Sequence, residues 1–328
     1  MNESINITQS PSRRDFLKRA TGLAMAAGAL GFNPSGLAAQ SRRWPVACRD
    51  AHLRATGQPD SWAALQELGA EGAEVEVNDE LVCPSLFHPA KKYTLAGAEA
   101  IQSLKADLAE KGLAITAFCL HNRLDERLEK ELAWNKRVVA AAQQLGVKAI
   151  RIDVVPRAIK REEFLPFAVK ACKQLCELVE GSPVRFGVEN HGNTTNDPGF
   201  LERLFDGVGS SHLGLTLDVA NFYWYGHPLE ELYSLYAKFA PRVVHTHCKS
   251  IRYPDDKKNV RRPMGWEYDK YCCPIYEGDV DFKRLAGILR KANYAGDLCL
   301  EDESLGKFPN EERGVVLKKE IAFLTSQA

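Results

Sequence analysis

The sequence predicts a (β/α)8 barrel, also called a TIM barrel, for three reasons. Short apolar runs rich in β-branched residues alternate with longer amphipathic segments from about residue 44 onward. Eight such pairs fit in the roughly 285 residues that remain, which is the size that this α/β fold needs. Third, the later apolar runs, which are the predicted strands, each end in a polar residue. A doubly wound sheet is the alternative, but no glycine-rich dinucleotide or phosphate loop follows an early strand.

The elements follow one another in regular order. Strands are expected at 44–48, 72–77, 113–120, 147–152, 184–189, 213–217, 243–247 and 298–301. Helices are expected at 60–68, 96–111, 125–145, 162–180, 200–205, 229–239, 280–292 and 310–324. Asp60 or Ser61 is a suitable N-cap for the first helix, and glycines close the next three. The prolines of residues 81–92 predict an inserted loop, and residues 252–279 form a second loop, long enough to be a lid.

Residues 1–39 are expected to be a twin-arginine signal peptide rather than part of the fold. Arg13 and Arg14 precede Phe16 and Leu17, an apolar run too short for a membrane span follows at 20–32, and small residues end the segment. The mature barrel would then cover residues 40–328. This leader predicts that the twin-arginine export machinery is a partner and that the protein is periplasmic or otherwise exported.

Charge and cysteine content exclude some classes of protein. The 43 Lys and Arg residues balance the 43 Asp and Glu residues, so no basic excess indicates a nucleic acid partner. The nine cysteines are odd in number and irregularly spaced, which argues against a disulfide framework. Cys119, Cys248 and Cys299 are expected in the core. Cys272 and Cys273 are expected in a loop, where one of them could form a disulfide.

Four polar residues end the last four predicted strands: Glu189, Asp218, His247 and Glu301. Each alone could be a helix N-cap. In a barrel, however, all four converge at the C-terminal mouth, where active sites of this fold lie. Three carboxylates repel one another unless a cation lies between them. Three carboxylates and one imidazole suit a single divalent ion, either Mn²⁺, Mg²⁺, Co²⁺ or Zn²⁺.

Short motifs around these residues resemble a known family. They are Val-Glu-Asn-His at 188–191, Leu-Asp-Val-Ala-Asn at 217–221, Val-His-Thr-His-Cys-Lys at 244–249 and Leu-Glu-Asp-Glu at 300–303. The chain resembles the sugar phosphate isomerase/epimerase group of xylose isomerase-like TIM barrels over its whole mature length. Two positions depart from the family pattern: Asn221 stands where epimerases often carry His, and Ser250 where Asp often follows Lys.

The resemblance implies that Glu189, Asp218, His247 and Glu301 bind one divalent metal ion. It further implies a metal-dependent epimerase or isomerase of a sugar or keto-sugar that removes a proton next to a carbonyl through an enediolate. Glu189 and Glu301 would exchange protons with the small-molecule carbohydrate from opposite faces. A lyase or hydrolase that acts on a keto-glycoside at the same site is the alternative hypothesis. A non-catalytic sugar-binding barrel is a third hypothesis. A homo-oligomer that pairs through the mouth loops is also compatible with the family.

Several residues near the predicted ligands are candidates for substrate binding. They are His121, His191, Asn221, Lys249 and His245, although His121 could instead cap a loop and His245 could be a hydrogen-bonded core residue. The aromatic run at 222–227 could stack on a sugar, pack against a neighbouring loop or form a dimer contact. Arg261 and Arg262 could bind an anion or form a solvated face.

Overall fold

The computed structural model describes residues 43–328. The predicted signal peptide at 1–39 lies outside this range. Within residues 43–328, none of the helices combines the length and the apolar character that a membrane crossing requires.

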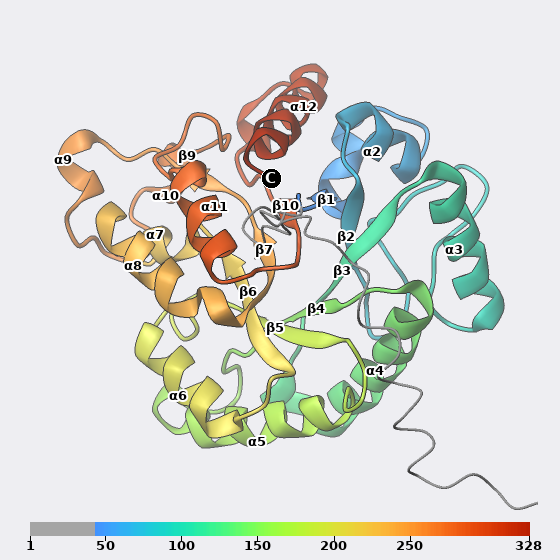
Figure 1. Ribbon diagram of the computed structural model, residues 1–328, viewed down its shortest axis with the longest axis horizontal. Coiled ribbons are helices and arrows are strands. Elements are labelled where there is room, and N and C mark those ends of the chain that lie inside the picture. Colours follow the sequence, from blue (N-terminus) through green and yellow to red (C-terminus); the bar gives the residue numbers. More distant parts are fainter. Residues whose placement is uncertain (1–42) are drawn as a thin grey trace, which may run out of the picture. The chain divides into compact units, whose positions relative to one another are not determined.

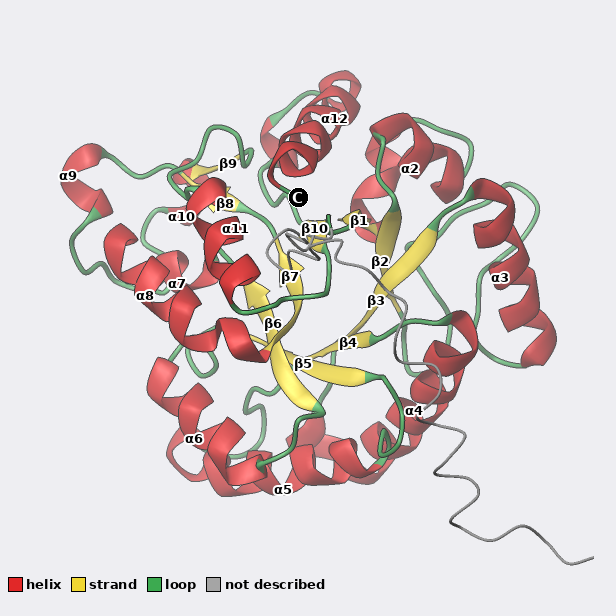
Figure 2. Cartoon of the chain, in the orientation of Figure 1, coloured by secondary structure: helices red, strands yellow, loops and turns green. Residues whose placement is uncertain are grey.

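Eight parallel strands form a nearly closed barrel, as the sequence predicts, and helices surround it (Figures 1 and 2). The strands are β1 (Val46–Arg49), β2 (Gly72–Glu76), β3 (Ala114–Leu120), β4 (Ala149–Ile152), β5 (Arg185–Glu189), β6 (Leu213–Asp218), β7 (Val243–His247) and β10 (Leu298–Leu300). Neighbours pair in the order β10-β1-β2-β3-β4-β5-β6-β7. Cys248 completes the circle: its N–H donates to Cys299 O at 2.7 Å, and its carbonyl accepts from Glu301 N at 3.1 Å.

The helices follow the strands in the predicted alternation. They are α2 (Ser61–Leu68), α3 (Ala98–Lys111), α4 (Leu124–Leu145), α5 (Arg161–Glu177), α6 (Pro198–Val208), α8 (Leu229–Phe239), α11 (Phe282–Lys291) and α12 (Asn310–Gln327). Asp60 caps α2, because its carboxylate accepts from Trp62 N at 2.9 Å and Ala63 N at 2.8 Å. Helix α5 ends three residues earlier than expected, because Leu178 and Val179 donate to carbonyls three residues back and tighten the last turn.

The connections between the main strands and helices contain short elements that the sequence does not predict. They are η1 (Asp50–Thr56), α7 (Asn221–Trp224), η2 (Ala240–Arg242), β8 (Ser250–Ile251), α9 (Asp255–Lys258), α10 (Tyr268–Tyr271), β9 (Cys272–Cys273) and η3 (Leu305–Lys307). Cys272 and Cys273 were expected in a loop, but they form β9, which pairs antiparallel with β8. All nine cysteines are free thiols, and Cys119, Cys248 and Cys299 are buried as predicted.

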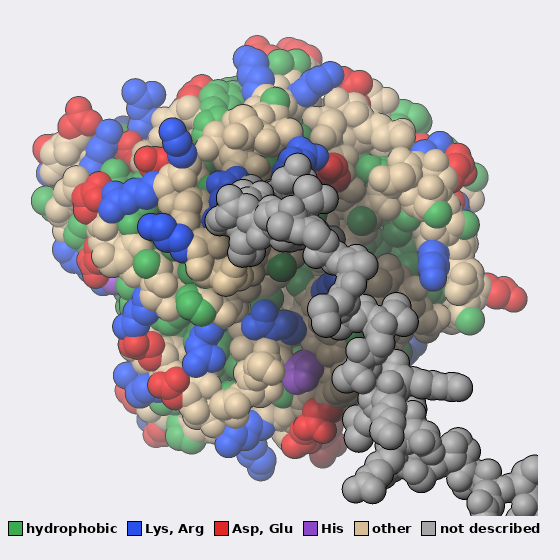
Figure 3. Space-filling model, viewed as in Figure 1, with side chains coloured by type: hydrophobic (Ala, Val, Ile, Leu, Met, Phe, Trp, Pro, Cys, Tyr) green, Lys and Arg blue, Asp and Glu red, His purple; other side chains and the backbone are tan. Residues whose placement is uncertain are grey.

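The barrel interior is polar toward its C-terminal mouth, whereas the apolar core lies between the strands and the helices. Gly187 lies two residues before Glu189 on β5, and a Cβ there would come within 2.3 Å of Thr216 Oγ1 and 2.7 Å of Val244 Cγ2. The interior therefore has no room for a side chain beneath Glu189. On the face drawn in Figure 3, side chains of both charge signs are interspersed, in keeping with the balanced composition.

Candidate metal centre

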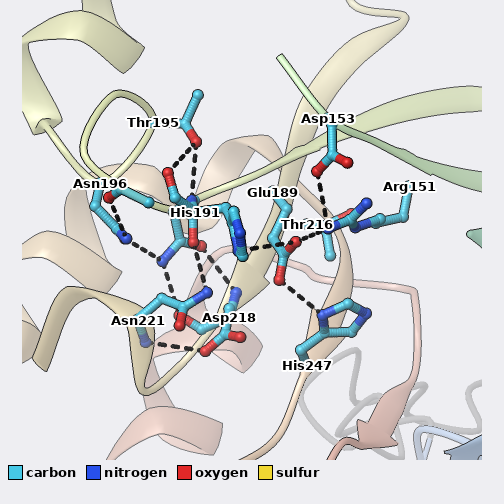
Figure 4. A network of polar contacts seen from close by, with 12 residues as sticks. Arg151, Asp153, Glu189, His191, Thr195, Asn196, Thr216, Asp218, Asn221 and His247 are labelled. Atoms are coloured by element: carbon cyan, nitrogen blue, oxygen red, sulfur yellow. Dashed lines mark hydrogen bonds and ion pairs between the residues drawn. The ribbon is translucent and has the colours of Figure 1, made fainter. Parts of the chain in front are cut away.

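The structure brings the four predicted ligands together at the mouth of the barrel. Glu189, Asp218 and His247 are the last residues of β5, β6 and β7, and Glu301 directly follows β10. All four are at least nine-tenths buried, and one donor atom from each lies within 4.8 Å of the others. In Figure 4 the side chains of Glu189, Asp218 and His247 lie close together, and a dashed line joins Glu189 to His247.

The two glutamates share one arrangement. Each directs one oxygen toward His247 Nδ1, at 3.0 Å for Glu189 Oε1 and 3.2 Å for Glu301 Oε2. The other oxygen of each glutamate contacts an arginine of the neighbouring strand, Arg151 for Glu189 and Arg49 for Glu301. A charge-assisted hydrogen bond to Arg fixes the carboxylate plane and leaves the second oxygen directed at the centre.

A lysine is the third cationic side chain of the site, after Arg151 and Arg49. Lys249 Nζ lies 2.8 Å from Asp218 Oδ2, 3.2 Å from Glu301 Oε2 and 2.8 Å from Glu303 Oε1. The Tyr268 hydroxyl donates to the second oxygen of Glu303. Because Tyr268 belongs to α10, this chain of contacts connects the long mouth loop to the site.

Asp218 is held by the backbone and by Asn190. Its Oδ1 accepts from Ala220 N and Asn221 N, both at 2.9 Å, and its own N–H donates to Asn190 Oδ1 at 2.8 Å (Figure 4). The Asn221 side chain donates to Asn190 O at 2.8 Å. Asn190 and Asn221 therefore join the ends of β5 and β6, and this pins Asp218 in place.

The charges of the site oppose one another strongly. Burial disfavours a charged imidazole, but the carboxylates of Glu301, Glu74 and Glu189 outweigh it and raise the pKa of His247 well above its usual value. Burial raises the pKa of Asp218, and Glu301 and Glu189 add to the rise, while Lys249 opposes it. Burial also disfavours ionised Glu301, yet His247, Lys249 and Arg49 lower its pKa well below the usual range.

These residues fit a divalent cation. Three carboxylates and one imidazole nitrogen supply the oxygen and nitrogen donors that Mn²⁺, Mg²⁺, Co²⁺ and Zn²⁺ accept. Within residues 43–328, the fully buried Asp218 Oδ2 accepts no hydrogen bond of good geometry, although Lys249 Nζ lies 2.8 Å away, so this oxygen retains the capacity to bind a cation. A cation there would offset the repulsion among the three carboxylates.

The predicted substrate residues occupy different places. The side chains of His121 and His191 are 50% and 54% exposed; His121 Nδ1 lies 3.5 Å from Asp153 Oδ2, and His191 Nδ1 lies 3.8 Å from Glu189 Oε2. Both can meet a ligand at the mouth. Asn221 and Lys249 are buried beside Asp218. His245 is fully buried under the site, with Nδ1 2.7 Å from Asp297 Oδ1.

Two further expectations are resolved by packing. Phe222 stacks on Phe239, and Tyr223 packs edge-on against Tyr253, so these members of the aromatic run 222–227 belong to the core. Arg262 is 5% exposed and donates to backbone carbonyls, among them Tyr223 O at 3.0 Å. Its role is to hold the mouth loop, and it is neither an anion site nor part of a solvated face.

Sequence reasoning missed three charged residues inside the barrel: Arg49, Glu74 and Arg151. Glu74 is fully buried, and both of its oxygens lie 3.0 Å from His247 Nε2. The available signal was a charged residue at an alternate position within an otherwise apolar strand, as in Ala-Ile-Arg-Ile of β4. Such a residue normally faces solvent, so the signal is weak.

Comparisons with known proteins agree with this architecture. A xylose isomerase-like TIM barrel protein from Mycobacterium smegmatis, solved with magnesium, is 17% identical with a TM-score of 0.62, over 88% of this chain and 99% of that one. The IOLI protein, solved with a zinc atom, is 17% identical with a TM-score of 0.62, over 86% and 98%. 3-Keto-D-glucoside 4-epimerase, YcjR, from E. coli is 15% identical with a TM-score of 0.60, over 87% and 100%.

At these identities the solved structures establish the fold alone. Other matching structures include sugar epimerases and a probable dehydratase. No curated protein matches the chain. The family described as xylose isomerase-like TIM barrel matches residues 62–327, and the chain therefore belongs to this family.

Proposed function

We propose that the protein is a divalent-metal-dependent epimerase or isomerase that acts on a sugar or keto-sugar by moving a proton next to a carbonyl. One observation carries the proposal: two buried glutamates, Glu189 and Glu301, converge with Asp218 and His247 on one point. When bound there, a divalent ion would polarise the substrate carbonyl and make the neighbouring C–H bond more acidic.

Side chains of the protein would transfer the proton and stabilise the charge that develops on the substrate. Glu189 ends β5 and Glu301 follows β10, and one oxygen of each lies within 3.2 Å of His247 Nδ1, so we propose that one removes a proton and the other returns one to the opposite face. Arg151 and Arg49 hold these carboxylates in place. The Lys249 ammonium would stabilise negative charge that develops on the substrate oxygen.

Further groups would recognise the carbohydrate. The imidazoles of His121 and His191 are half exposed. A sugar hydroxyl can donate a hydrogen bond to an imidazole nitrogen or accept one from it. The magnesium, zinc and epimerase descriptions of the similar structures support this proposal without defining the ion or the sugar.

Metal content and solvent exchange test this proposal. The protein is purified without chelator, its metals are measured, and D-fructose, L-ribulose and methyl 3-keto-glucoside are incubated with it in D2O. We expect about one divalent ion per chain and metal-dependent deuterium incorporation, visible by NMR, at the carbon beside a carbonyl of at least one probe. Protein free of metal, or an absence of exchange in all probes with metal added, would rule the proposal out.

Elimination is the second candidate, and Lys249 is the observation that favours it. Its ammonium touches Asp218, Glu301 and Glu303, so it could protonate a glycosidic or hydroxyl oxygen that leaves after the same proton removal. Loss of methanol from methyl 3-keto-glucoside would identify a lyase. Recovery of a deuterated epimer with the methyl group retained would identify an epimerase.

Export through the twin-arginine pathway is part of the proposal and rests on the sequence of residues 1–39. The double substitution Arg13→Lys with Arg14→Lys should retain the protein in the cytoplasm, because the arginine pair is the feature that defines such signals. Cell fractionation of a bacterium with this pathway provides the measurement. Equal periplasmic amounts of both proteins would contradict the assignment.

A further inference from the structure

We infer that Glu74 is the positioning residue for His247, the single imidazole of the metal centre, and that it determines which ring nitrogen faces the metal. This inference rests on the proposed function, because it assigns a role toward the metal that the site is proposed to hold. Glu74 lies on β2, a strand that contributes none of the four predicted ligands, and the motifs of the sequence do not include it.

The geometry assigns the two ring nitrogens of His247 to different partners. Nε2 lies 3.0 Å from each oxygen of Glu74, and Nδ1 faces Glu189 and Glu301. A carboxylate can only accept, so Nε2 must carry the proton in this contact. Nδ1 also faces carboxylates and so carries a proton in the metal-free protein; a bound cation would replace that proton, while Glu74 keeps the proton on Nε2. Both Glu74 and His247 are fully buried, so water cannot replace either partner.

Glu74 is itself fixed from two sides. Arg49 Nε lies 3.0 Å from its Oε2, and His245 Nε2 lies 3.3 Å from its Oε1. Asp297 in turn holds His245 Nδ1 at 2.7 Å. The chain Asp297–His245–Glu74–His247 thus runs beneath the site, and it gives the buried His245 a supporting role without contact to substrate. Carboxylates behind metal-binding histidines orient the ring and strengthen its bond to the metal.

The same three side chains, Glu74, His245 and His247, are also close enough together to hold a cation of their own. The position of Arg49 argues against this, because its guanidinium already lies 3.0 Å from Glu74 Oε2 and would repel a second ion. The stoichiometry of metal binding separates a positioning carboxylate from a second metal site.

The test compares full-length Glu74→Gln with the wild type. Mn²⁺ is titrated into chelator-treated protein by calorimetry, and histidine-labelled protein saturated with diamagnetic Zn²⁺ is examined by ¹H–¹⁵N NMR. We expect one Mn²⁺ per wild-type chain and roughly 10- to 100-fold weaker binding in the variant. We also expect a slowly exchanging Nε2–H of His247 in the wild type that is lost from the variant spectrum.

Two further variants keep the test decisive. Glu131→Gln is the matched control, because Glu131 is also fully buried and paired with an arginine, Arg127, and it should retain wild-type affinity. Glu74→Asp keeps the charge beside Arg49 but withdraws the oxygens from Nε2, so it should also weaken Mn²⁺ binding. It replaces the glutamine variant in the test if that variant fails to fold.

The outcomes are distinct. Unchanged Mn²⁺ affinity in folded Glu74→Gln or Glu74→Asp overturns this inference and leaves the metal centre intact. Two ions per wild-type chain and one in Glu74→Gln overturn it in favour of a second metal site. A wild-type chain that binds no ion removes the metal centre and this inference with it.

Discussion

The ends of β5 and β10 differ from the end of β6 in what neutralises their carboxylates. Glu189 and Glu301 each contact an arginine from the adjacent strand, Arg151 on β4 and Arg49 on β1. In the part of the chain that the structure describes, no arginine pairs with Asp218, and Lys249 Nζ lies 2.8 Å from its Oδ2.

This difference separates two roles among the four candidate ligands. An arginine is always charged and presents its donors in a rigid plane, so it keeps Glu189 and Glu301 ionised and oriented with or without a metal. Lysine is a flexible point charge, and Lys249 divides its contacts among three carboxylates. Asp218 is therefore the candidate ligand whose charge would depend most on the arrival of a cation.

The largest expected effect is on proton transfer by the arginine-held glutamates. Glu189→Gln and Glu301→Gln should each lower deuterium exchange and turnover by about 10²- to 10⁴-fold, because an amide cannot accept the proton. Circular dichroism should show a retained fold, and Glu131→Gln, a buried carboxylate outside the site, should exchange normally. Normal exchange in Glu189→Gln or Glu301→Gln would show that these residues are not the bases.

Removal of an arginine should lower stability. Arg151→Met leaves Glu189 buried without its cation, so the free energy of unfolding should fall by roughly 3–5 kcal/mol in urea titrations. Arg284→Met breaks an exposed pair with Glu230 and should cost at most about 1 kcal/mol. Adding Glu189→Gln to Arg151→Met should recover part of the loss. Equal effects of the two single arginine variants would contradict the comparison.

Metal should stabilise the folded chain by mass action. At a free Mn²⁺ concentration about 100 times the Kd, the free energy of unfolding should rise by about 2.7 kcal/mol, since the unfolded chain lacks the converged ligands. Thermal unfolding with Mn²⁺ and then with excess chelator measures the gain and its reversal. A melting temperature that changes with neither Mn²⁺ nor chelator would mean that the four residues do not bind the ion.

Asp50 extends the comparison to a carboxylate away from the metal centre. It is fully buried, and burial raises its pKa to about 8, despite the hydrogen bond from Glu76 N at 3.0 Å. A folded pKa above the unfolded value of 3.8 favours the protonated form, so the contribution to stability is present at low pH. It is lost as pH rises from about 4 to about 8, with a slope of at most about 1.4 kcal/mol per pH unit.

The difference between wild type and Asp50→Asn isolates this contribution. Urea titrations from pH 4 to pH 8 should show the wild type losing stability relative to the variant as pH rises. A gain of the wild type over the variant in that range would mean that the Asp50 carboxylate is stabilised in its charged form, as Glu189 is by Arg151.

The sequence predicted the barrel and the four converging residues for one physical reason. Parallel strands carry their carboxyl ends to the same mouth, so a polar residue that ends an apolar run can be assigned a place without knowing its neighbours. Glu189, Asp218, His247 and Glu301 all meet this condition. The family resemblance then added their expected roles.

Partners that lie far apart in the chain could not be predicted in this way. Arg49 and Glu301 are 252 positions apart and meet only because β1 and β10 close the barrel. Glu74 occupies an alternate position in β2, where the pattern alone does not show whether a charge faces solvent or the interior. The hairpin of β8 and β9 has two residues in each strand, too few for a periodic signal.

The smallest effect on stability is expected for Asp218→Asn, and this variant tests the comparison most directly. An asparagine oxygen can still accept from Ala220 N and Asn221 N, and no arginine loses its partner. Metal-free Asp218→Asn should therefore unfold within about 1 kcal/mol of the wild type. Metal-free Glu189→Gln should lose more, because it leaves Arg151 without one of its two carboxylates. Added Mn²⁺ should stabilise the wild type but not Asp218→Asn. If metal-free Asp218→Asn instead loses as much stability as Glu189→Gln, Lys249 and Asp218 form a structural ion pair equivalent to the arginine pairs.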